Sequence, residues 1–114
     1  MTAFRVLLAS MLMIVLAYTG VVIATHGLGL LPVFFSDIQA MNWPGQFNLD
    51  FSCLLVLSGL WLAWRHRFSP AGIALGGLAT IGGTPVLASY LLIASIQAKG
   101  DAKVLLLGTG RIAP

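Results

Sequence analysis

A run of nineteen residues, from Val6 to Ala24, contains no charged side chain. At about 1.5 Å per residue, a helix over this run nearly matches the ~30 Å hydrocarbon core of a bilayer. The run is longer than the apolar core of a secretory signal peptide, about 7–15 residues, and no clean cleavage site follows it. We therefore predict a retained first membrane span over about residues 4–24, with a cleaved signal peptide as the alternative.

Two further apolar blocks, over about residues 47–64 and 71–98, predict a second and a third span. The third block is longer than a bilayer requires, so we expect it to tilt or to kink. Pro85 is the expected kink, because it has no backbone N–H to donate to the carbonyl four residues earlier.

A short apolar segment and a polar loop are expected between the first two spans. Residues 27–35 are rich in Gly and Pro and too short to span alone, so we expect an interfacial or half-inserted segment. Residues 36–46 contain Asp37 and Asn42 and the turn signal Trp43-Pro44-Gly45. These residues predict a loop.

Composition favours a bilayer over water as the surroundings of this chain. Charged residues make up 8% and hydrophobic residues 59% of the sequence, whereas a soluble domain carries about 25% charged residues. The predicted fold class is all-α, an integral membrane bundle of three transmembrane helices that forms one domain over residues 1–114. We expect a multi-pass protein of a bacterial inner membrane, with the lipid bilayer as a partner.

The distribution of Lys and Arg predicts an orientation. Three spans place Arg5, Arg65 and Arg67 on one side of the membrane. The other side then holds Lys99, Lys103 and Arg111, which leaves the count tied. Because the loop over residues 36–46 has no Lys or Arg, we predict a cytoplasmic N-terminus.

Aromatic and basic residues flank the second span and predict its anchors at the membrane interfaces. Trp43 precedes the span, Trp61 and Trp64 lie near its end, and Arg65 and Arg67 follow it. Tryptophan rings favour the half-wetted interface, and arginines there can contact lipid phosphates.

Small residues mark the third span. Gly72 and Gly76 form a GxxxG pair, and Gly83 extends the small-residue character. Such residues let helices approach closely in lipid. We predict that they serve helix packing, either inside the chain or against a homo-oligomeric or other membrane protein partner.

Asp50 is the only acidic residue near a span. Ionisable groups there are functional candidates, with a helix-capping acid as the alternative. Three spans would bring His26, Asn48 and Tyr90 to the same end as Asp50, where they could relay protons or bind a headgroup. Unrelated interfacial residues are the alternative, and His66 is expected to be a solvated loop residue.

Several function classes are disfavoured. The net charge of +3 comes from only six Lys and Arg at the edges of apolar blocks, so we expect no nucleic-acid binding. Cys53 is the only cysteine, which excludes an intrachain disulfide and a multi-cysteine metal site. No phosphate-binding loop or zinc-protease motif is present. We expect no cofactor and no metal, and we predict no catalytic residue.

Three hypotheses for function are open. The first is an accessory or structural subunit of a membrane complex, because the chain is small and has few polar groups. The alternative is a small oligomeric transporter or channel that uses Asp50, because broken helices often line transport sites. The third is a membrane enzyme or lipid-binding protein that uses His26, Asp50 and Tyr90.

A sparse set of residues carries a family resemblance, over about residues 41–108. The set comprises Trp43-Pro44, Asp50, Trp61, Trp64, the basic loop and the Gly-rich span that ends near Tyr90. This layout resembles small bacterial integral membrane protein families of unknown function. The resemblance implies no activity, but it makes Trp43, Pro44 and Asp50 more interesting as functional candidates.

Overall fold

The computed structural model describes residues 1–108, which contain helices and turns and no strand. The all-α prediction is therefore confirmed. In chain order the helices are α1 (Thr2–His26), α2 (Leu30–Gln39), α3 (Trp43–Arg65), α4 (Pro70–Gly82), α5 (Thr84–Gln97) and α6 (Ala102–Leu107).

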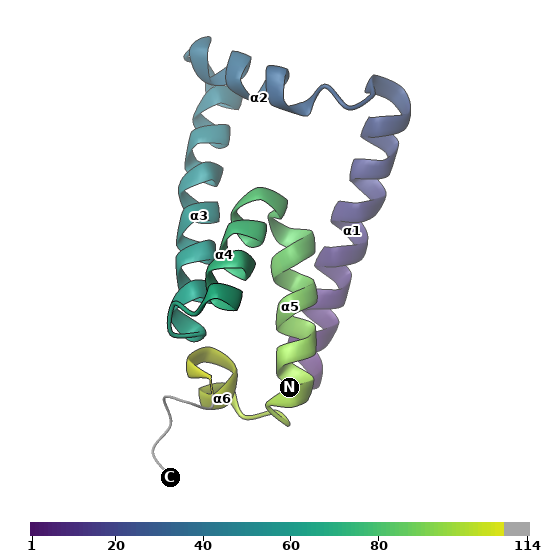
Figure 1. Ribbon diagram of the computed structural model, residues 1–114. Coiled ribbons are helices and arrows are strands. Elements are labelled where there is room, and N and C mark those ends of the chain that lie inside the picture. Colours follow the sequence, from purple (N-terminus) through teal and green to yellow (C-terminus); the bar gives the residue numbers. More distant parts are fainter. Residues whose placement is uncertain (109–114) are drawn as a thin grey trace.

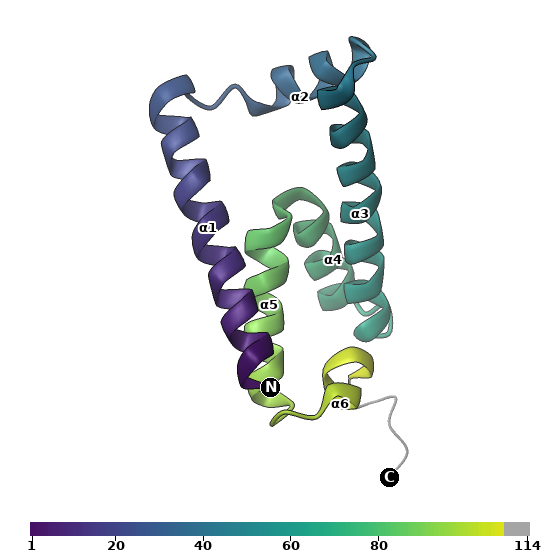
Figure 2. The same cartoon turned by 180° about the vertical axis from the view of Figure 1, so that it is seen from behind.

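The long helices α1 and α3 run in opposite directions, and α2 lies across the gap between them at one end of the molecule (Figures 1 and 2). We call this the α2 end. The opposite end holds Met1, the turn between α3 and α4, and α6 (Figure 1), and we call it the basal end. By length and composition, α1 and α3 are the two described helices that are able to cross a membrane.

The third predicted span is not one helix. Residues 70–97 form two antiparallel helices, α4 and α5, of 13 and 14 residues. Figure 1 shows α4 rising from the basal end to about the middle of the molecule and α5 returning beside it. The prediction of a third span over residues 71–98 is therefore wrong, because each half is too short to cross a bilayer.

The sequence around Gly83 explains the reversal. Gly83 has a φ of 65°, a conformation that glycine adopts without steric cost, and its N–H donates to the Ala79 carbonyl at the end of α4. Pro85 then stands in the first turn of α5, where a missing N–H costs no helical bond. The expected proline kink is thus a complete change of direction.

The corner between α2 and α3 also differs from the expected loop. Asn42 accepts a hydrogen bond from the Gly45 N–H at 2.9 Å, so α3 begins at Trp43 rather than near residue 47. Pro44 suits this first turn. Gly45 is required there, because an added Cβ would clash with the Asp37 carbonyl of α2.

Each long helix packs on one arm of the hairpin. Helix α4 lies against α3 and α5 against α1, while the α2 ends of both long helices extend beyond the hairpin (Figure 2). A small core of Ala94, Ala98 and Leu105 closes the basal end. Apolar side chains elsewhere are largely exposed: only 6% of the apolar stretch of α1 and 17% of that of α3 are buried.

Candidate functional site

Arg65, the last residue of α3, connects three helices at the basal end. Its Nε donates to the Leu105 carbonyl at 2.7 Å and one Nη to the Val104 carbonyl at 3.2 Å, both in α6. Its other Nη donates to the Tyr90 hydroxyl of α5 at 2.7 Å. The guanidinium is therefore fixed in position by neutral oxygen acceptors.

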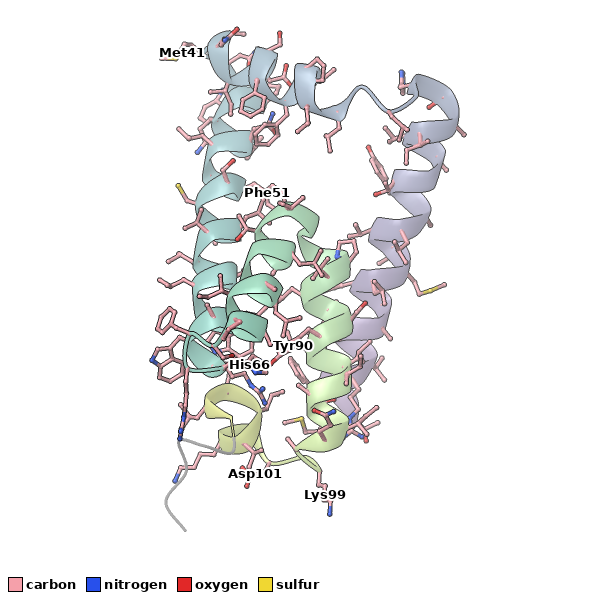
Figure 3. The ribbon with its side chains drawn as sticks, viewed as in Figure 1. Met41, Phe51, His66, Tyr90, Lys99 and Asp101 are labelled. Atoms are coloured by element: carbon pink, nitrogen blue, oxygen red, sulfur yellow. The ribbon has the colours of Figure 1, made fainter. Side chains whose placement is uncertain are left out.

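The Tyr90 hydroxyl also contacts His66. Its hydroxyl lies 2.5 Å from Nε2 of His66, and Figure 3 shows the two side chains facing each other. Because Arg65 donates to the Tyr90 oxygen, the hydroxyl proton is available for His66, whose Nε2 then accepts. The Arg65 guanidinium carbon also lies 5.6 Å from the centre of the Tyr90 ring, within cation–π range.

The protonation of His66 fits this chain of donors. Partial burial lowers the pKa of His66 from 6.5, and the adjacent Arg65 cation lowers it further. Both effects disfavour the imidazolium. The Nε2 atom of a neutral ring can accept a hydrogen bond from the tyrosine hydroxyl. Arg65 therefore donates to Tyr90, and Tyr90 donates to His66.

Two further long-range contacts hold the basal end together. The indole N–H of Trp61 donates to the Leu106 carbonyl at 3.1 Å, which ties α3 to α6 a second time. Arg5 of α1 donates to both the hydroxyl and the carbonyl of Ser95 in α5, at 3.0 and 2.9 Å. Ser95 is fully buried. All of the tight polar contacts between α1, α3, α5 and α6 thus lie at this end of the described chain.

A pocket of about 420 Å³ opens beside this network. Its polar lining comes from Arg65, His66 and Arg67 at the end of α3 and from Gln97 at the end of α5. Val104 and Gly108 of the α6 region complete one wall. Two of the four polar side chains, Arg65 and Arg67, carry a positive charge and none is acidic, so the pocket favours an anion.

The predicted cluster of His26, Asn48, Asp50 and Tyr90 is not formed. Tyr90 lies at the basal end, because the chain reverses at Gly83 before reaching it (Figure 3). At the α2 end, α2 separates His26, at the end of α1, from α3 (Figure 1). Asn48 donates to the Phe34 carbonyl of α2 at 3.2 Å and so holds the corner together.

Asp50 is not a helix cap. It is the eighth residue of α3, whose cap is Asn42. Gly59, which is buried against α4, follows nine residues later, which at about 100° per residue places Asp50 on the opposite side of α3. Asp50 is exposed and makes no hydrogen bond or ion pair within residues 1–108.

The remaining predicted residues occupy both ends of α3 and one face of α4. Trp43 lies at the α2 end, and Trp61, Trp64, Arg65 and Arg67 lie at the basal end. Gly72 and Gly76 are buried on α4 against the end of α3 and Gly59, whereas Gly83 makes the hairpin turn.

Sequence reasoning missed the network of Arg65, His66 and Tyr90. Its only signal in the sequence is the Gly82-Gly83-Thr84-Pro85 stretch, which is compatible with a reversal as well as with the predicted kink at Pro85. A reversal there places Tyr90 at the same end as the basic residues. Within the described residues, no three His, Cys, Asp or Glu side chains are placed to hold a metal ion.

Comparisons of the chain with protein-family models, with curated proteins and with solved structures find no match.

Proposed function

We propose that this chain is an integral protein of a bacterial inner membrane that serves as an accessory subunit of a larger membrane complex. The observation that carries the proposal is the outward-facing carboxylate of Asp50.

Trp43 and Trp64 set the depth of α3. They are 21 residues apart, which corresponds to about 31 Å along a helix axis and agrees with the ~30 Å hydrocarbon core. Tryptophans at both ends favour the two interfaces. Asp50 then lies seven residues, or about 10 Å, inside the α2 boundary.

The depth and direction of Asp50 support a contact with another protein. An aspartate at the centre of a membrane helix costs about 2.5–3.5 kcal/mol on insertion scales. Ionisable groups in spans therefore face a protein partner or a water-filled cavity. Asp50 faces away from α4, and no partner for its carboxylate is present among residues 1–108.

The partner would be a different protein rather than a second copy in the same orientation. All Lys and Arg among the described residues lie at the basal end: Arg5, Arg65, Arg67, Lys99 and Lys103. The described residues of a parallel copy thus offer no Lys or Arg at the depth of Asp50. A neighbouring span with a Lys, Arg or polar side chain would complement the carboxylate.

The same basic residues support an orientation. Residues 24–46, which form the α2 end, contain no Lys or Arg. The positive-inside rule then favours a cytoplasmic basal end. In this orientation the N-terminus is cytoplasmic, as predicted from the sequence. Lys99 and Lys103 are cytoplasmic as well, because α4 and α5 enter and leave the membrane on the same face.

Purification in a mild detergent, with mass determination and identification of copurifying proteins, tests the proposal. We expect a stoichiometric larger membrane protein with the wild type and with Asp37→Asn, which removes a carboxylate from α2. Asp50→Asn should lose that partner while the protein still inserts. A homo-oligomer without any other protein would contradict the accessory role, and a partner retained by Asp50→Asn would exclude Asp50 as the contact.

A small oligomeric transporter is the second candidate, and the hairpin is the observation that favours it. Half-length helices that meet inside a membrane line many transport sites. The turn at Gly83 lies beside Phe51 and Leu55 of α3, at nearly the depth of Asp50. Asp50 faces away from this turn, so a transport path that includes both Asp50 and the hairpin turn needs the turn of a second copy. Flux in vesicles that is lost in Asp50→Asn, without any partner, would favour this candidate.

A further inference from the structure

We propose that the basal pocket is a binding site for a phosphate group, carried by an anionic lipid headgroup or free in solution. The site lies at the opposite end of the molecule from Asp50. The test of this site is therefore independent of the test of the accessory role.

Arg65 is the central donor of this site. A guanidinium has five N–H donors, and the three bonds to Leu105, Val104 and Tyr90 leave two available. No carboxylate within residues 1–108 forms an ion pair with Arg65, so its charge is not neutralised by the described part of the chain. Arginine is the preferred side chain for phosphate oxygens, because its planar donors match them in pairs.

The fixed geometry of Arg65 favours binding. Its bonds to α6 and α5 hold the side chain in one position before any ligand arrives. Binding then does not have to order a flexible arginine, which removes one entropic cost of association. The site is thus organised in advance by neutral groups that do not compete with the anion for charge.

The other polar side chains of the pocket complement Arg65. Arg67 adds a second positive charge, and the Gln97 amide and the His66 ring offer further polar atoms. The nearest acidic residue along the chain, Asp101, accepts the N–H groups of Lys103 and Val104 at the start of α6 and does not line the pocket. The pocket volume of about 420 Å³ has room for a phosphate and part of a headgroup.

A neighbouring apolar groove makes a lipid a suitable source of the phosphate. The groove has a similar volume of about 420 Å³ and includes Leu54, Leu57 and Trp61 of α3 and Leu91 of α5 in its lining. Trp61 precedes Arg65 by one helical turn, about 6 Å toward the membrane centre. An acyl chain would find apolar surface close to the pocket, at the depth where lipid phosphates lie.

Native mass spectrometry of the full chain in mild detergent is the first test. Phosphatidylglycerol, phosphatidylcholine and inorganic phosphate are added separately, and thermal unfolding is followed in parallel. We expect phosphatidylglycerol to be retained in preference to phosphatidylcholine and to raise the unfolding temperature. Stabilisation by inorganic phosphate as well would show that the phosphate alone suffices; stabilisation by the lipid alone would identify the headgroup as the source.

Two matched pairs of variants locate the site. Arg67→Gln should weaken retention about fivefold, since one basic charge near a membrane surface contributes about this factor. Lys103→Gln removes the same charge outside the pocket lining and should have a smaller effect. Gln97→Glu places a negative charge in the pocket and should also weaken retention about fivefold, whereas Gln46→Glu at the α2 end should not.

Two results would overturn the proposal. The first is that neither the anionic lipid nor inorganic phosphate is retained or stabilises the protein. The second is that Lys103→Gln and Arg67→Gln reduce retention equally, because that would indicate attraction to the basic end as a whole. None of the four variants removes a contact of Arg65, so each keeps the bonds that hold α6 in place.

Discussion

The hydroxyl of Tyr90 lies 2.5 Å from Nε2 of His66, although the two residues are 24 positions apart. The contact exists because the chain reverses at Gly83 and returns Tyr90 to the end from which α4 started. With Arg65 as donor to the same hydroxyl, it ties the end of α3 to α5 and, through the carbonyls of Leu105 and Val104, to α6. This one tyrosine oxygen therefore links α5 to both Arg65 and His66 at the basal end.

Removing that oxygen should destabilise the protein. Tyr90→Phe keeps the ring but leaves Arg65 and His66 without their shared partner. We expect the free energy of unfolding to fall by about 1.5–3 kcal/mol, the range for hydrogen bonds to charged groups. Unfolding in a detergent titration measures it. Tyr18→Phe, at a highly exposed position of α1, is the control, and an equal effect of both variants would contradict the network.

Stability should depend on pH through His66. Its folded pKa lies below the unfolded value of 6.5, because of burial and the Arg65 cation. Between the two pKa values the unfolded chain binds more protons than the folded chain, so stability is lost as the pH falls below about 6.5. His66→Gln, which still offers Tyr90 an acceptor, should flatten the profile of unfolding temperature against pH. A profile of His66→Gln that is identical to that of the wild type would refute the assignment.

Two adjacent glycines of α4 should respond in opposite ways. An added Cβ at Gly76 meets the Gly59 carbonyl of α3, whereas one at Gly77 meets nothing within 4 Å. Gly76→Ala should therefore cost about 1–3 kcal/mol through overpacking. Gly77→Ala should be neutral or stabilise by up to about 1 kcal/mol through helix propensity. Unfolding titrations of the two variants decide it, and equal effects would argue against the close approach of α3 and α4.

The hairpin makes a clear prediction about the termini. Reporters that are active only on one side of the membrane, fused separately to each end, should both report the cytoplasm. A single third span would place the C-terminal reporter on the opposite side. Opposite signals would therefore contradict the hairpin in the membrane, and two periplasmic signals would reverse the proposed orientation.

Much of the local structure was predictable because its causes are local. The charge-free run of α1 and the apolar block of α3 follow from composition and length. The reversal at Gly83 was not predictable from the same reasoning, because a glycine before a proline is compatible with either a kink or a turn. As a result, Tyr90, Lys99 and Lys103 are predicted at the α2 end but lie at the basal end in the structure.

The candidate sites show the same division. Asp50 is conspicuous in the sequence as an acid in an apolar block, but its direction depends on α4, which covers the opposite side of α3. His66 is predicted from the sequence to be a solvated loop residue, whereas the reversal at Gly83 brings Tyr90 into contact with it.

An all-helical chain with two long apolar helices follows from the sequence alone, since helix length and apolar content depend on residues that are neighbours along the chain. Which helix ends meet depends on the tertiary fold. Contacts such as Arg65 with Tyr90, or Arg5 with Ser95, depend on the path of the backbone between them, and a single change of direction at Gly83 alters every such distance beyond it.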